Sequence, residues 1–199
     1  MSTDLALPFQ IPLPLACDTL APLSAALNAA THEERVSWLR GLGTFQIRKL
    51  YRLAQGSPLF ADELAPEPGT EYIGEGKNAL PLPVLSDFQK RFARVGGQIA
   101  GYNKTGKLAT TFAGPGHFTV TNSPDVPGEV WIDYRTVAQE RYPTFPALSS
   151  SDQGFWPKVV YGGMVDICRR VSQHVVVGDS FVNGKPKHVP FALVFHPIP

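Results

Sequence analysis

One stretch of the sequence, residues 159–195, constrains the fold most, because it predicts several consecutive β-strands. Val175 to Val182 and His188 to Phe195 are rich in Val and Phe, which favour strands. Asn183-Gly184 lies between them and is typical of a type I′ hairpin turn, since both residues tolerate positive φ. Pro186 lies two residues further on, so the alternative is a loop longer than two residues. Upstream, Met164 to Val171 alternates as another strand, so this part of the chain predicts an antiparallel sheet.

The other predicted strands begin after residue 96 and are separated by Gly- and Pro-containing turns. They are Gln98 to Asn103, Lys107 to Phe112, His117 to Asn122 and Glu129 to Val137. Six to eight strands in meander order, without α/β alternation, favour a mainly β (α+β) fold. We expect an antiparallel meander barrel or half-barrel, preceded by a helical N-terminal segment.

The first 95 residues are expected to form an extended arm and helices that pack on a barrel of residues 96–199. Residues 19–199 are expected to fold as one cooperative unit. The arm contains prolines that exclude regular structure. Thr31 and Glu34 have the spacing of a capping box, which marks the start of a helix.

Residues 57–83 are rich in Pro, Gly and acidic residues and are expected to form a long surface connection. Val84 to Val95 is expected to be one more amphipathic helix, because Phe88 and Phe92 lie four residues apart. In that helix, Lys90 would lie on the exposed face. Such a helix would plug the barrel or lie across its mouth.

The composition narrows the class of function. The chain has 199 residues, with 18 Lys and Arg against 17 Asp and Glu, and this near-neutral balance argues against nucleic-acid binding. Cys17 and Cys168 have neither disulfide nor metal-site spacing, so reduced thiols and a cytoplasmic location are expected. No apolar run reaches the roughly 18 residues of a membrane span.

Charged residues on two predicted strands are the main source of candidate chemistry. Asp133 and Arg135 share one face of their strand with Trp131, and Asp166 and Arg170 share one face of another. If these faces point into a barrel, the charges must be paired or ligand-bound, and a carboxylate there is suited to acid–base work. The alternative is an outward ladder of cross-strand ion pairs.

The candidate residues fall into two groups. The acid–base candidates, if the protein is an enzyme, are Asp133, Asp166, Arg170, Tyr161 and His174. The candidates for ligand contact are Trp131, Arg135, Tyr102, Phe118, His117, Met164, Phe181 and Phe191. The histidines form no close ligand pair, and no phosphate-binding loop is visible, so we expect neither a metal nor a cofactor.

Two blocks carry a resemblance to a known family: GPGHFTV with EVWIDYRTV, and VYGGMVDICRRVSQHVVVGDSF. Over about residues 96–195 they resemble an uncharacterised bacterial family whose expected shape is similar to lipocalin-like or plastid-lipid-associated (fibrillin-type) barrels. The resemblance implies a small barrel that binds hydrophobic molecules. Some similar barrels are cofactor-free enzymes of natural-product pathways.

Three functions therefore stay open. The first is binding of a hydrophobic or aromatic small molecule inside the barrel, where the many aromatic residues would form the lining. The second is a cofactor-independent cyclase, isomerase or lyase of secondary metabolism, using Asp, His and Tyr groups in the same pocket. The third is an interaction domain without a ligand, which predicts a filled barrel. A homodimer is also left open.

Overall fold

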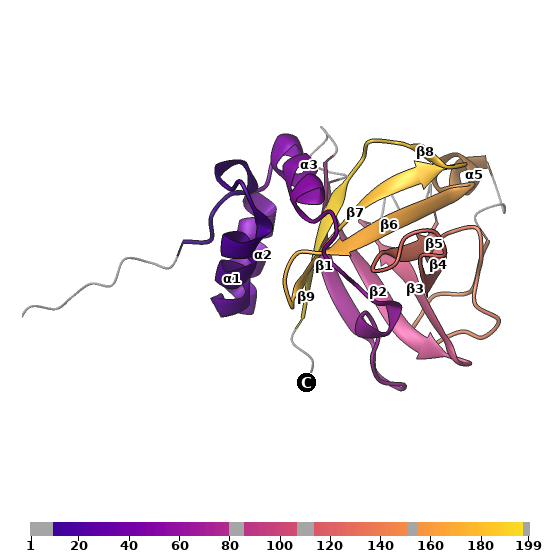
Figure 1. The fold of residues 1–199 in the computed structure, drawn as a ribbon. Helices are drawn as coiled ribbons and strands as arrows, with labels where there is room; N and C mark the ends of the chain where they lie inside the picture. Colours follow the sequence, from indigo (N-terminus) through magenta and orange to yellow (C-terminus); the bar gives the residue numbers. More distant parts are fainter. Residues whose placement is uncertain (1–9, 80–85, 107–113, 151–154, 197–199) are drawn as a thin grey trace, which may run out of the picture.

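The computed structural model describes residues 10–79, 86–106, 114–150 and 155–196 (Figure 1). Eight antiparallel strands form a closed β-barrel, and helices lie beside it, as the mainly β prediction requires. Among the described helices, none is both long and apolar enough to cross a membrane.

Most strands that are neighbours in the sheet are also consecutive in the chain. They are β1 (Tyr72–Asn78), β2 (Asp87–Val95), β3 (Gln98–Lys104), β4 (His117–Asn122), β5 (Val130–Asp133), β6 (Met164–Arg170), β7 (Val175–Val182), β8 (Lys185–Pro186) and β9 (Phe191–Phe195). β1 to β6 form a meander, β9 pairs with both β1 and β7, and β7 pairs with β6 to close the ring. The short β8 pairs with the end of β7.

The predicted hairpin at Asn183-Gly184 is confirmed. Val182 pairs with Lys185, so the turn has two central residues. These have φ values of 51° and 75°, the positive φ that a type I′ turn needs. The strand predicted over 107–112 lies outside the described residues.

The helix predicted over Val84 to Val95 is wrong, because residues 87–95 form strand β2. Phe88 and Phe92 are spaced four apart, which suits one helical face, but the same spacing suits one strand face with Lys90 between them. The strand forms because neighbours exist on both sides, β1 and β3. β1 itself lies in the predicted surface connection, so the sheet begins at Tyr72.

The N-terminal helices lie against the outer face of the barrel beside β1, β7 and β9 (Figure 1). They are α1 (Leu20–Ala29), α2 (His32–Gly41) and α3 (Thr44–Leu53). The predicted capping box begins α2: Thr31 Oγ1 accepts from the Glu34 amide at 3.2 Å, and Glu34 accepts in return from the Thr31 amide at 2.7 Å. Two short 3₁₀ turns (Pro14–Ala16 and Ala61–Glu63) and α5 (Phe155–Tyr161) complete the described helices.

Two apolar cores result from this arrangement. One lies inside the barrel and includes Phe92, Phe118 and Leu193. The other lies between the helices and the outer faces of β7 and β9, and includes Leu39 and Val177. β7 is therefore covered on both faces, which explains its nearly continuous run of Val in the sequence.

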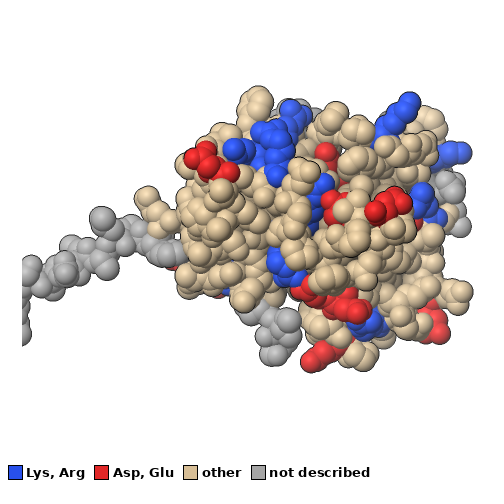
Figure 2. Space-filling view, viewed as in Figure 1, with Lys and Arg blue, Asp and Glu red and all other residues tan. Residues whose placement is uncertain are grey.

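Ion pairs also join the helices to the barrel. Arg40 of α2 contacts Glu75 of β1 and Asp87 of β2, each at 3.0 Å. Acidic and basic side chains are intermixed over the face seen in Figure 2. That face therefore carries no broad field of one sign, in agreement with the near-zero net charge.

Candidate ligand-binding cavity

Strand register places two polar pairs on the inner wall of the barrel. Lys90 of β2 is directly opposite Asn103 of β3, and Asp166 of β6 is directly opposite Ser180 of β7. Lys90 Nζ donates to Asn103 Oδ1 at 3.0 Å, and Ser180 Oγ donates to Asp166 Oδ1 at 2.7 Å. Each pair is a cross-strand neighbour on one face, the unit of contact in an antiparallel sheet.

The two pairs meet across the lumen. β2 and β6 are four strands apart in either direction around the eight-stranded ring, so they face each other. The long Lys90 side chain spans this distance, and its Nζ lies 3.1 Å from Asp166 Oδ2. Tyr134, which follows β5, joins them: its hydroxyl bonds Lys90 Nζ and lies 3.2 Å from Asp166 Oδ2 and 3.1 Å from Asn103 Nδ2.

This network is almost wholly removed from solvent. The side chains of Lys90 and Asp166 are 3% and 2% exposed, and Tyr134 is 1% exposed. Burial and the nearby Asp166 raise the pKa of Tyr134 well above its usual value. Its hydroxyl therefore keeps its proton at neutral pH and can act as a hydrogen-bond donor.

Four aromatic rings surround the Lys90 ammonium. The centroids of Phe191, Tyr134, Phe118 and Phe88 lie 4.9, 5.0, 5.1 and 5.6 Å from Nζ. Tyr134 contacts Nζ through its hydroxyl group, whereas the Phe rings at such distances attract the cation, the more so where water is excluded. The rings therefore partly offset the cost of burying this charge.

Glycines on the neighbouring strands let three of these rings lie close to the barrel wall. The three opposed pairs are Gly76 with Phe88, Gly101 with Phe118, and Gly178 with Phe191. A Cβ atom at any of these glycines would overlap the opposing ring. Glycine is thus required here for a close approach, and the lumen keeps room for the Lys90 side chain.

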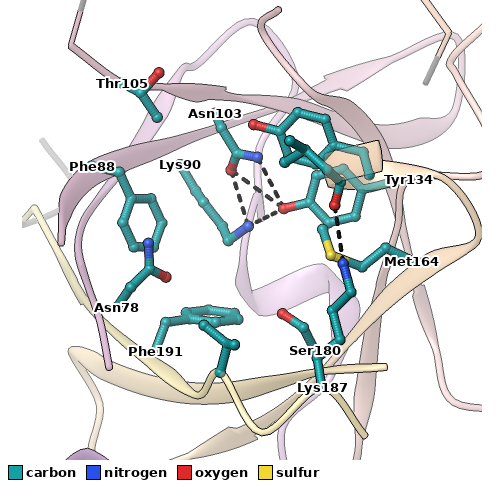
Figure 3. Close-up of a pocket in the computed structure, with 13 residues that line it drawn as sticks. Asn78, Phe88, Lys90, Asn103, Thr105, Tyr134, Met164, Ser180, Lys187 and Phe191 are labelled. Carbon is teal, nitrogen blue, oxygen red and sulfur yellow. Dashed lines mark hydrogen bonds between the residues drawn. The ribbon is translucent and has the colours of Figure 1, made fainter. Parts of the chain in front are cut away.

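A cavity of about 350 Å³ lies next to this network, at one end of the barrel (Figure 3). Its lining is Asn78, Phe88, Lys90, Asn103, Thr105, Tyr134, Val160, Tyr161, Met164, Ser180, Lys187, Val189 and Phe191. No Asp or Glu is found among these described lining residues, because Asp166 lies behind Lys90 and Ser180. The polar part of this described wall therefore consists of lysine amines and neutral amide and hydroxyl groups, without a carboxylate.

Tyr161 brings helix α5 to the wall of this cavity. Its ring stacks on Tyr134 with centroids 5.1 Å apart and an interplanar angle of 12°. Gly116 lies directly beneath the Tyr161 ring, where a Cβ would overlap it. Burial raises the pKa of Tyr161, so this second hydroxyl is also protonated at neutral pH.

A second cavity of about 420 Å³ lies away from the network. Arg170 and His174 line it together with Glu63, His196 and apolar residues. Arg170 forms an ion pair with Glu63 and donates to the Pro58 carbonyl at 2.9 Å. The charged groups of this second cavity are thus partly exposed, and Arg170 is paired with Glu63, unlike the buried network around Lys90.

The structure brings five of the predicted site residues to the Lys90 end of the barrel. Tyr161, Met164 and Phe191 line the cavity, Asp166 bonds the residues that line it, and Phe118 packs against Lys90. Arg170 and His174 line the second cavity instead. Phe181 lies outside the barrel, in a hollow formed with Tyr51 of α3.

For the Glu129 strand, the prediction that its charged face points into the barrel is wrong. Trp131, Asp133 and Arg135 are on the outer face, because Val130, Ile132 and Tyr134 fill the interior. Asp133 and Arg135 pair with each other at 2.7 Å, and the Arg135 guanidinium lies 5.8 Å from the Trp131 ring centre.

Two further ligand candidates also lie outside the lumen. His117 precedes the inward-facing Phe118, so its own side chain is on the opposite face, where Nε2 lies 3.0 Å from the Ala147 carbonyl oxygen. Tyr102 packs on Phe145 with ring centres 4.9 Å apart. Both residues hold the 138–150 segment against the barrel rather than line the cavity.

Lys90, Asn103, Tyr134 and Ser180 were not among the predicted site residues. Lys90 was missed because β2 was assigned to a helix. The signal that could have found it is the alternation of Phe88, Lys90 and Phe92 with polar residues, which places one charge in an apolar row. No comparable signal marks Ser180, since it lies within a run of residues buried on both faces.

The fold and the cavity together define a closed β-barrel with an internal polar network and a hollow end. Comparison with protein-family models, with curated proteins and with solved structures gives no match. The resemblance to lipocalin-like and fibrillin-type families thus stays a prediction. Within the described residues, no three His, Cys, Asp or Glu side chains are grouped so that they could hold a metal ion.

Proposed function

We propose that the barrel binds a small apolar molecule carrying one oxygen acceptor, in the cavity beside Lys90. The observation that carries this proposal is the cavity itself. Its volume of about 350 Å³ falls in the range of small-molecule sites, which are mostly apolar with a few converging polar groups. Phe88, Phe191 and Met164 supply apolar wall.

The polar groups favour an oxygen acceptor on the ligand. Lys90, Asn103, Tyr134 and Ser180 border the cavity and carry N–H or O–H groups, whereas Asp166 lies behind them. A carbonyl or carboxylate oxygen entering beside Lys90 would exchange one hydrogen bond of the network for another. A ligand cation would instead meet the Lys90 ammonium in a low-dielectric site, which is strongly unfavourable.

The acid–base alternative uses the same cavity with different residues from those first expected. Asp166 and Tyr161 are at this end of the barrel, but Asp133 and His174 are not. An enzyme would therefore rely on Lys90, Tyr134 and Asp166. The ligand-free alternative predicts a filled interior, and a void of this size weighs against it.

Native mass spectrometry of freshly purified protein, before and after denaturation, tests the proposal. Wild-type protein is expected to release a small organic molecule, or to take up an added apolar carboxylate such as naphthoate with 1:1 stoichiometry. Met164→Trp fills the cavity and should abolish this uptake. Val126→Trp adds the same side chain at an exposed position in the β4–β5 turn, so it should bind as wild type does.

Equal uptake by wild type and Met164→Trp would place the ligand elsewhere and refute the proposal. Absence of uptake for apolar carboxylates, aldehydes and alcohols alike would refute it as well. Circular dichroism of each variant shows whether the barrel remains folded, and the Val126→Trp protein provides the reference.

A further inference from the structure

The Lys90–Asp166 pair is a costly feature for a small barrel to retain. Taking two charges out of water costs several kcal/mol each, and well-packed apolar residues are often as stabilising or more so. Apart from Asn103, Ser180 and the Tyr134 hydroxyl, which bond the pair, the surrounding lumen is built of apolar and aromatic side chains. Stability alone therefore gives a weak account of why a lysine spans the lumen here.

The position of Lys90 suggests a chemical role. Its side chain is 3% exposed, yet it borders the cavity, and its amine is the only lysine amine in the described interior network (Figure 3). A buried lysine beside an apolar cavity is the arrangement used for imine formation with carbonyl compounds, because the amine is held against the bound carbonyl. The burial of Nζ limits the access of water that would hydrolyse the product.

We propose that Lys90 forms an imine with the carbonyl group of an apolar aldehyde or ketone bound in this cavity. The inference rests on the proposed binding function and deepens it, since it names the class of ligand and the atom that captures it. Lys90 Nζ is the nucleophile, Asp166 is the proton acceptor and counterion, and Tyr134 lies between them.

The reaction balances with groups that the cavity contains. The Lys90 ammonium gives one proton to Asp166, whose Oδ2 is 3.1 Å away. The amine adds to the carbonyl carbon, forming a C–N bond, while a proton moves from nitrogen to the carbonyl oxygen. The Tyr134 hydroxyl contacts both Nζ and Asp166 and can relay this proton.

Asp166 then returns its proton to the new hydroxyl group, which leaves as water. The net reaction converts one aldehyde and one ammonium into one protonated imine and one water, with no redox change. The lysine nitrogen carries one positive charge before and after the reaction. The Asp166 carboxylate and the aromatic rings around Nζ therefore stabilise the product as they stabilise the free lysine.

Reductive trapping tests the inference. Full-length protein is incubated with naphthaldehyde and sodium cyanoborohydride at neutral pH, and intact mass and peptide maps are recorded. We expect one added group, equal to the aldehyde less one oxygen atom, on Lys90. Lys90 should be labelled about tenfold or more faster than the exposed Lys185, because the bound carbonyl is held beside its amine.

Two variants and one ligand control sharpen the result. Lys90→Arg keeps the positive charge but cannot form an imine, so it should lose the fast labelling. Lys185→Arg should label as wild type does. Naphthalenemethanol has the same carbon skeleton without a carbonyl, so it should bind, as seen by ligand-observed NMR, and slow the labelling of Lys90.

The outcomes separate the two proposals. Binding of naphthalenemethanol without fast labelling of Lys90 overturns the imine inference and leaves the binding function in place. Equal labelling of Lys90 and Lys185, or preferential labelling of Lys187 at the cavity rim, also overturns the inference. Absence of both binding and labelling overturns the binding function and the inference together. The wild-type peptide map decides the matter even if Lys90→Arg fails to fold.

Discussion

Removing the Lys90 ammonium provides the sharpest test of the buried network. In Lys90→Met the side chain keeps similar length and apolar bulk, but Asp166 loses its cationic partner. Removing one partner of a buried ion pair costs about 3–5 kcal/mol, because the other charge is left buried and uncompensated. Asp166 keeps its bonds to Ser180 and Tyr134, so we expect the low end, about 3 kcal/mol.

The partner change should reverse most of this loss. Asp166→Asn in the Lys90→Met background removes the buried negative charge while preserving a group that can bond Ser180. The double variant is expected to recover at least about half of the lost stability, so it should be less destabilised than Lys90→Met alone and the two changes should not be additive. Lys185→Met, at an exposed position, should change stability by less than about 0.5 kcal/mol.

Urea unfolding followed by circular dichroism at pH 7 measures these free energies, provided that the urea dependence is the same in all variants. A cost below about 1 kcal/mol for Lys90→Met would refute the reasoning, since it would mean that the pair is hydrated. Additive effects in the double variant would equally show that the two charges do not interact across the lumen.

Three further predictions concern the barrel and its helices. Gly101→Ala should lower the free energy of unfolding in urea by about 1–3 kcal/mol, because the new Cβ overlaps the Phe118 ring and the Arg91 carbonyl. At Gly41 a new Cβ meets open space, so Gly41→Ala should not lower that free energy. Burial lowers the pKa of His117 in the folded chain. Below about pH 6.5 the unfolded chain therefore binds a proton at His117 more readily than the folded chain does. The free energy of unfolding should therefore be fully retained above pH 6.5 and fall as pH decreases below it, with a shallower fall in His117→Asn. Because α1–α3 share a core with β7 and β9, calorimetry should show one transition, and two separate transitions would contradict the single cooperative unit.

The parts of the fold that were predictable are those set by local chemistry. Asn183-Gly184 adopts positive φ at little cost, and Thr31 with Glu34 satisfies its own helix end. Met164 and Asp166 share one face of β6, as follows from the two-residue repeat of any strand. These features depend on residues that are close in sequence, so sequence reasoning reaches them.

The site depended on contacts between distant residues. Lys90 and Asp166 are 76 positions apart, and they meet because closure of the ring places β2 opposite β6. Residues 87–95 fit either a helix or a strand by their own spacing, and pairing with β1 and β3 decides for the strand. That decision moves Lys90 from an exposed helix face to the interior.

The sequence by itself thus determined that the chain forms antiparallel strands, where one tight turn lies and where a helix begins. Tertiary structure alone decided which charged side chains face the lumen. The face of a strand is fixed by which side acquires an apolar covering, and that covering comes from segments far away in the chain. For this reason Asp133 is paired outside the barrel, whereas Asp166 lies inside it beside Lys90.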